Sequence, residues 1–114
     1  MQYEVIHYRE YGRDIYQEWL DELKDFRGRA TILNAVNKVM DGNFGVHKHC
    51  RDGVWELVLD MGPGYRVYYS FIGRFVVLLL CAGQKRHQQR DIDKAVEYFK
   101  KYKEPIGNTN HHLH

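Results

Sequence analysis

Residues 53–85 read GVWELVLDMGPGYRVYYSFIGRFVVLLLCAGQK, and this stretch decides the fold. β-Branched and aromatic residues fill three runs, 54–61, 65–71 and 74–81, and such residues favour strands. The segments between the runs contain Gly62-Pro63-Gly64 and Gly73, which are typical of tight turns. The last run is apolar from Phe75 to Cys81, as expected of a strand that is covered on both faces. The sequence therefore predicts an antiparallel meander of three strands.

A hairpin turn centred on Pro63 predicts which residues of the first two runs face one another. Asp60 then faces Arg66, Val58 faces Tyr68 and Glu56 faces Ser70, and opposed residues point to the same side of the sheet. The polar side carries Glu56, Val58, Asp60, Arg66, Tyr68 and Ser70. The other side carries Trp55, Leu57, Leu59, Met61, Tyr65, Val67, Tyr69 and Phe71. A slip of one residue would bury the charges, so we expect helices on the apolar side and an open polar floor.

The residues before this stretch predict one strand and two helices. Residues 3–8 are rich in β-formers, and Gly12 ends that strand. The spacing of Ile15, Trp19 and Leu23 predicts a helix that begins at Asp14, whose carboxylate is suited to cap it. Gly28 marks a corner, and an apolar stripe that ends at Asp41-Gly42 predicts the second helix of an αα-hairpin. Residues 43–53 are polar and flanked by glycine, which predicts a loop.

The residues after the meander predict a third helix and a tail. Ile92, Ala95, Val96 and Phe99 have helical spacing, with acidic residues before them and lysines after them, as the helix dipole favours. The element order is β-α-α-β-β-β-α, which is an α+β domain over residues 1–104. Residues 105–114 predict a flexible tail.

Composition limits the class of protein. The 114 residues are 44% hydrophobic and 14% aromatic, which suits one folded domain and excludes a wholly disordered chain. No apolar run is long enough to span a membrane, and the N-terminus lacks the order of a signal peptide. The two cysteines, Cys50 and Cys81, are too few for a disulfide scaffold, so we expect free thiols in the cytoplasm.

The charge is uneven along the chain. Residues 1–46 hold 6 Lys/Arg against 8 Asp/Glu, whereas residues 47–114 hold 11 against 7. A basic half of this kind indicates a polyanion as partner, although it also serves as ordinary solubility charge. No metal site is predicted, because His47, His49 and Cys50 lack a second pair at zinc-finger spacing. The histidines at 111, 112 and 114 belong to the predicted tail.

The polar floor has the groups that metal-independent RNA cleavage requires. A base takes the proton of the 2′-hydroxyl, cations stabilise the phosphorane, and an acid protonates the leaving oxygen. Glu56 or a histidine is suited to be the base, and Arg66 and Lys85 to hold the phosphate. His87, Lys48 or His49 is suited to be the acid, and Tyr68 to stack a base or share a proton. In a meander, however, the segment with Lys48 and the segment with Lys85 are expected at opposite ends.

Each of these residues also has a structural interpretation. Glu56 and Arg66 are suited to pair with neighbouring charges, and Tyr68 to pack in the sheet. A histidine in a loop is more often solvated than catalytic, and Lys85 is suited to be an ordinary exposed charge.

Several motifs resemble the addiction-module killer proteins, the HigB-like branch of the RelE/ParE toxin superfamily. They are Gly53-Val54-Trp55-Glu56-Leu57, then Gly64-Tyr65-Arg66-Val67-Tyr68-Tyr69, then Gly83-Gln84-Lys85 with Gln88 and Asp91-Ile92. The resemblance covers nearly the whole chain, and the predicted element order agrees with the RelE-like fold. It implies the toxin of a type II toxin–antitoxin pair.

The resemblance also implies partners and site residues. RelE-like members cleave mRNA on the ribosome and thereby inhibit translation, without a cofactor or metal; ParE-like members inhibit DNA gyrase instead. The recurring Glu, Arg and Lys of the family correspond to Glu56, Arg66 and Lys85, and we add Tyr68 and His87 as candidate catalytic residues. The candidate RNA-binding residues are Lys48, His49, Arg51, Arg86 and Arg90. Gln84, Arg86 and His87 depart from the branch, which usually has an acidic residue before the lysine and small hydroxyl residues after it.

Three hypotheses follow from the sequence. The first is a ribosome-dependent mRNA endoribonuclease that is neutralised by a cognate antitoxin, expected to be a small helix-turn-helix protein. The second is a non-enzymatic inhibitor of gyrase. The third is a decayed toxin that only binds its antitoxin.

Overall fold

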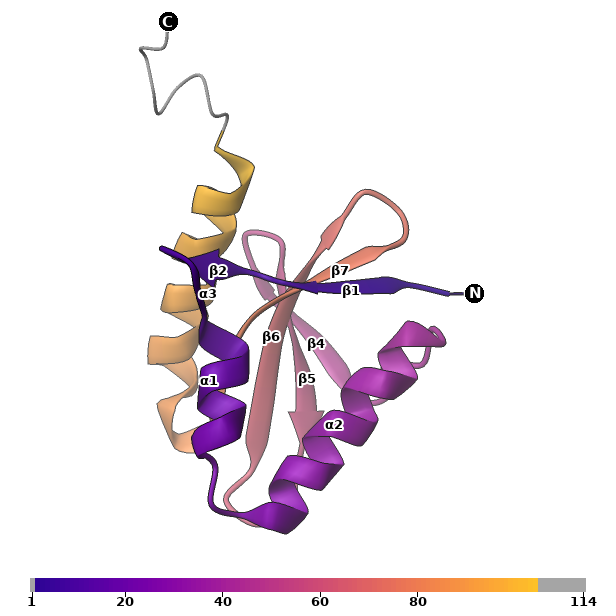
Figure 1. Cartoon of the computed structure of the whole chain (residues 1–114), viewed down its shortest axis with the longest axis vertical. Coiled ribbons are helices and arrows are strands. Elements are labelled where there is room, and N and C mark those ends of the chain that lie inside the picture. The colour runs from indigo at the N-terminus through magenta and orange to yellow at the C-terminus, as the bar shows by residue number, and fades with distance from the viewer. Residues whose placement is uncertain (1, 105–114) are drawn as a thin grey trace, which may run out of the picture.

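The computed structural model describes residues 2–104, which form an α+β fold with a five-stranded mixed sheet and three α-helices (Figure 1). The strands of the sheet lie in the order β1-β7-β6-β5-β4. β1 (Glu4–His7) runs parallel to β7 (Val76–Gln84), and every other neighbouring pair is antiparallel. The predicted α+β class is therefore confirmed, and the predicted tail at 105–114 lies outside the described residues.

The meander of β5 (Val54–Leu59), β6 (Tyr65–Ile72) and β7 forms the centre of the sheet, as predicted. The predicted register was wrong by two residues: Glu56 faces Tyr68 and Val58 faces Arg66, because the turn occupies one more position on the β5 side. A shift of two keeps each side chain on its predicted face, since side chains alternate with period two. The polar and apolar faces are consequently the ones that the sequence predicted.

The predicted loop over residues 43–53 was wrong, because His47–Arg51 form the edge strand β4, antiparallel to β5. The first strand also ends earlier than predicted. It is followed by a small hairpin of β2 (Arg9–Glu10) and β3 (Arg13–Asp14), with a two-residue turn at Tyr11 and Gly12.

The αα-hairpin covers the apolar face of the sheet. Helix α1 (Ile15–Glu22) is capped by Asp14, which accepts from the Gln17 N–H at 3.0 Å, as predicted. Helix α2 (Phe26–Met40) begins at Asp25, so Gly28 lies within its first turn and the predicted corner at Gly28 was wrong. The two helices and the sheet bury one core cluster: Tyr16, Leu20, Ile32, Val36, Val39, Leu57, Tyr65, Val67, Tyr69, Val77, Leu79 and Ala82.

Helix α3 (Gln88–Lys103) covers the other face, which the sequence predicted to be open. A single turn of 3₁₀ helix, η1 (Lys85–His87), links it to β7. Ala95, Val96 and Phe99 pack against residues that include Val54 and Tyr68. The predicted open floor was wrong for this reason: the apolar stripe of α3 needs a surface to bury, and this face offers Tyr68, Leu78 and Leu80.

Candidate nucleic-acid interface

The centre of the candidate site is a buried ion pair between β5 and β6. Glu56 and Arg66 project from the same face, with Arg66 Nε 3.9 Å from Glu56 Oε1. Their residues are 2% and 5% exposed, so this pair is shielded from water. Separating the two side chains would leave an uncompensated buried charge, so they are expected to stay paired.

The Arg66 guanidinium has a second carboxylate beside it. Arg66 Nη1 donates to Asp60 Oδ1 at 3.2 Å and to the Tyr65 carbonyl at 3.0 Å. The Asp60 side chain is 70% exposed, so it reaches the buried guanidinium from the solvent side. Arg66 Nε is buried and has no hydrogen-bond partner within the described chain.

Gln88, on helix α3, forms hydrogen bonds to Glu56 on the sheet. The first residue of α3 places its side-chain amide 2.9 Å from Glu56 Oε1 and 3.1 Å from Oε2. The amide donates to both carboxylate oxygens, which partly compensates Glu56 for the loss of water. The sequence analysis assigned Gln88 only to a motif, and its partner across the layers became evident from the structure.

Tyr68 lies beneath α3. The residue has no exposed surface, and its hydroxyl is buried without a hydrogen-bond partner in residues 2–104. Burial, with the nearby Glu56 and Asp91 carboxylates, raises the pKa of Tyr68 well above its ordinary value. The structure therefore places this candidate catalytic residue within the core, where it packs between β6 and α3.

Asp91 is a second buried acid near this site. Its Oδ2 atom has no hydrogen-bond partner among the described residues, while Oδ1 accepts from Arg90 Nε at 3.3 Å. Burial raises the pKa of Asp91, and Arg90 opposes that shift. Asp91 was not among the predicted site residues.

The segment after β7 presents cations at the same end of the sheet. Lys85 and Arg86 are exposed and His87 is half-buried, all within η1. The Lys85 N–H donates to the Gly64 carbonyl at 2.9 Å, which ties η1 to the β5–β6 turn. Within residues 2–104 no ion pair engages Lys85 or Arg86, whereas Arg90 pairs with Asp91.

The edge strand β4 places Lys48 opposite Glu56 and therefore on the same face, and Lys48 has no ion pair in the described part of the chain. Because β4 runs antiparallel to β5, Lys48 is level with Tyr68 and Cys81, three residues along the strands from the end of β7 at Gln84. The Lys48 and Lys85 segments are therefore nearer than expected, whereas Arg51 stays at the other end of the sheet, opposite Val54. Signals for an edge strand were weak here, since its residues are polar and mostly exposed.

Two predicted residues do not join the site. His49 lies opposite Trp55 on the other face of the sheet, with ring centroids 5.0 Å apart. Arg51 is engaged by Asp52 at 2.9 Å and by Asp93. The structure thus places Glu56, Arg66 and Lys48 on one face, with the base of Lys85 across Gly64 from Arg66, and it places His49 on the other face.

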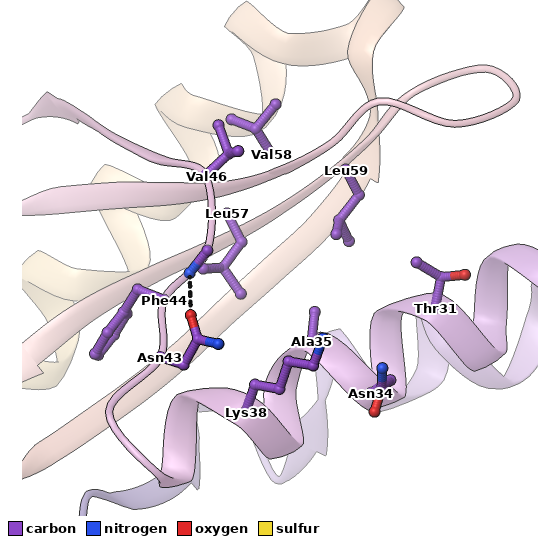
Figure 2. Close-up of a pocket in the computed structure, with 11 residues that line it drawn as sticks. Thr31, Asn34, Ala35, Lys38, Asn43, Phe44, Val46, Leu57, Val58 and Leu59 are labelled. Carbon is purple, nitrogen blue, oxygen red and sulfur yellow. Dashed lines mark hydrogen bonds between the residues drawn. The ribbon is translucent and has the colours of Figure 1, made fainter. Parts of the chain in front are cut away.

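Hollows lie on the surface beside the candidate site and between α2 and β5. One, of about 330 Å³, is lined by Asp60, Gly62, Pro63, Gly64 and Lys85, beside the candidate site. The other, of about 180 Å³, lies between α2 and β5 (Figure 2). Its floor is apolar, with Leu57 and Leu59, and Lys38 is the one ionisable residue in its lining. Each hollow thus has one lining cation, and the first also has a lining carboxylate, Asp60.

Other features of the described residues complete the account of the site. Cys50 and Cys81 are both free thiols. No three His, Cys, Asp or Glu side chains within residues 2–104 gather as a metal-binding group. No helix in that range combines the length and apolar character needed to cross a bilayer.

Comparison with known proteins finds a relative in Haemophilus influenzae. No family model matches the chain. A Haemophilus influenzae protein described as an uncharacterized protein is 41% identical over 80 residues, which cover 70% of this chain and 81% of that protein. The chain belongs to the same family as this Haemophilus influenzae protein.

Proposed function

We propose that this protein is the toxin of a type II toxin–antitoxin pair, of the RelE/ParE kind, and that it cleaves mRNA on the ribosome in the cytoplasm. The motif resemblance around Glu56, Arg66 and Lys85 supports the family assignment. One observation carries the activity: beside the buried Arg66–Glu56 pair, Lys48 lies opposite Glu56 on the same face and the base of Lys85 lies across Gly64 from Arg66, and neither lysine has an ion pair in the described chain.

This arrangement suits an RNA backbone. Phosphate groups are held by lysine and arginine, and cations that have no carboxylate partner bind them without first losing an ion pair. Lys48 lies on β4, and Lys85 and Arg86 lie on η1, so the cluster spans the sheet from its edge strand to the end of β7. A single-stranded message is therefore the proposed ligand of this surface.

The proposed reaction uses the 2′-hydroxyl of the message as its own nucleophile. The 2′-oxygen loses its proton to a base and bonds to phosphorus, and the bond from phosphorus to the 5′-oxygen breaks as that oxygen accepts a proton. Arg66 and Lys85 stabilise the charge on the phosphorane. Glu56 and His87 are the candidate base and acid, and Glu56 also fixes the Arg66 guanidinium.

A second candidate function is favoured by burial. Tyr68 has no exposed surface and Glu56 is 2% exposed, so fewer proton-transfer groups face solvent than the cleavage chemistry ideally needs. A protein that inhibits a target such as gyrase by binding alone needs no proton-transfer groups. In either case the proposed partner that neutralises the toxin is a small helix-turn-helix antitoxin encoded next to it.

Controlled expression in a bacterial host tests the proposal. We expect growth arrest with cleaved messages, mapped by primer extension. Lys85→Ala and Arg86→Ala should relieve the arrest, whereas Arg74→Ala, which removes an exposed cation at the other end of β7, should not. Circular dichroism of each variant verifies that it is folded.

Two results would overturn the nuclease function. Growth arrest with intact messages and a DNA-damage response would favour the gyrase candidate. The absence of any arrest, together with a stable complex with the neighbouring gene product, would leave only antitoxin binding.

A further inference from the structure

Arg66 is buried, yet one anionic group already reaches it from solvent. The Asp60 carboxylate, on a side chain that is 70% exposed, accepts from Arg66 Nη1 at 3.2 Å. A route wide enough for a carboxylate therefore connects solvent to the guanidinium. Other anions of similar size can approach Nη1 only by taking the place of Asp60, because Glu56 and the Tyr65 carbonyl occupy the inner side.

The hollow beside this contact is shaped by Gly64. A Cβ at Gly64 would lie 3.1 Å from Lys85 Cβ and 3.8 Å from Arg66 Nη1, so the Gly64 backbone lies between the base of the Lys85 side chain and the Arg66 guanidinium. Gly64 also has φ +78°, a left-handed conformation that favours glycine. Its carbonyl accepts the Lys85 N–H, so the turn and the base of the Lys85 side chain are fixed together.

The charges in this hollow are unevenly partnered. Asp60 and Lys85 both line it, yet Lys85 has no carboxylate within ion-pair distance in residues 2–104. Asp60 instead contacts Arg66, which already has Glu56 as a buried partner. The hollow thus has one lining cation, Lys85, and one lining carboxylate, Asp60, which is solvent-exposed and contacts the buried Arg66 at 3.2 Å. Because the Asp60 partner is exposed, water and salt screen this ion pair from one side, and an incoming anion can compete for the guanidinium.

We propose that the Asp60 carboxylate is a built-in competitor at the phosphate site that Arg66 and Lys85 are proposed to form, and that it holds the place of a phosphate oxygen on Arg66 until the anion displaces it. A phosphate group offers oxygens to both Arg66 Nη1 and Lys85, whereas the Asp60 carboxylate is paired with Arg66 alone. The ligand is a phosphodiester of RNA if the proposed function holds, and the anion site itself does not depend on that function.

Asp60→Asn isolates the competitor, because it keeps the shape of the side chain and removes its charge. We expect the variant to bind phosphate groups about two- to fivefold more tightly at low salt, the range that exposed ion pairs support. The gain should shrink as salt is raised, since exposed charges are screened. Asp21→Asn on α1 is the matched control, because it changes the net charge equally at an exposed site away from the hollow.

Two probes separate the sources of the phosphate group. Inorganic phosphate is titrated into the full chain and followed by the NMR shifts of the Gly64 and Lys85 amides. A single-stranded RNA hexamer with 2′-O-methyl groups, which cannot be cleaved, is followed by fluorescence anisotropy. Tighter binding of both probes to Asp60→Asn than to Asp21→Asn supports the subsite for RNA, and tighter binding of inorganic phosphate alone supports a site for free phosphate.

The subsite is overturned if Asp60→Asn binds neither probe more tightly than Asp21→Asn does, or if the Gly64 and Lys85 amides do not respond to phosphate. This result is distinct from failure of the proposed function. Intact messages in arrested cells, with phosphate binding that Asp60→Asn strengthens, would remove the nuclease and keep the subsite. Cleaved messages with equal binding by the two variants would keep the nuclease and remove the competitor role of Asp60.

Discussion

Asp91 packs against Gly83 so closely that a methyl group on Gly83 would overlap the Asp91 carboxylate. Gly83 lies on β7 directly opposite Arg66, and Asp91 lies in the first turn of α3. Because Gly83 has no side chain, the first turn of α3 can pack directly against β7 beside the candidate site.

Gly83→Ala should destabilise the protein by about 1–3 kcal/mol, because inserting a methyl group into a filled site forces its neighbours apart. Chemical denaturation measures the change. The double variant Gly83→Ala/Asp91→Ala should cost less than the sum of the single variants, since Asp91→Ala removes the group that the methyl would meet. Additive costs would show that the strain arises elsewhere.

The stability contributed by Asp91 should fall as the pH rises. Burial raises the folded-state pKa of Asp91 above its ordinary value of 3.8, so the contribution is full below that pH and is lost as the pH rises through the folded pKa. Asp91→Asn cannot ionise. Its free energy of unfolding relative to the wild type should therefore increase between pH 4 and pH 7.

The contribution of Asp25 to stability should change with pH in the opposite direction. Hydrogen bonds from the Tyr65 hydroxyl and the Gly28 N–H lower the pKa of Asp25, so its contribution is present above pH 3.8 and is lost as the pH falls. Asp25→Asn should be most destabilising near neutral pH and least at low pH. Parallel pH profiles for Asp25→Asn and Asp91→Asn would contradict both assignments.

Gln88→Ala should destabilise the protein by about 1–3 kcal/mol, because it leaves the buried Glu56 carboxylate without its amide donor. The neighbouring Gln89 is a close control, since it is exposed and bonds only to Asp93 on its own helix. Gln89→Ala should stay within about 0.5 kcal/mol of the wild type. Equal costs in urea denaturation would show that Gln88 does not stabilise Glu56.

Tyr11→Asn should stabilise the protein by up to about 1 kcal/mol. Tyr11 and Gly12 form the two-residue turn between β2 and β3, with φ of 50° and 82°, and asparagine tolerates this left-handed conformation better than tyrosine. Tyr11 is 91% exposed, so little packing is lost. Tyr11→Ala, which keeps the unfavourable conformation, should show no gain in melting temperature.

The sequence was sufficient to predict the central meander and its two faces. Alternation along residues 54–71 sets the side on which Glu56 and Arg66 lie. The predicted faces were correct although the predicted register was wrong by two residues. The Asp14 cap was predictable because its hydrogen bond is local. These features depend on neighbours along the chain or directly across one hairpin.

What the sequence could not predict depends on contacts between distant elements. The polar residues at 47–49 lack apolar alternation, so β4 is recognisable only through its pairing with β5. The burial of Tyr68 and the Gln88–Glu56 contact follow from the docking of α3, which no local pattern specifies. The sequence therefore indicated Glu56, Arg66 and Lys85 as candidate site residues, but it did not indicate that Glu56 and Arg66 are buried.

The parallel pairing of β1 with β7 constrains how the protein folds during its own synthesis. Glu4 is made before its partner Val76, and two helices and three further strands of the sheet lie between them along the chain. The nascent chain therefore holds an unpaired strand and uncovered apolar stripes until β7 has been made, and long-range pairing of this kind is slow and prone to aggregation. Newly made chains should consequently depend on chaperones during elongation.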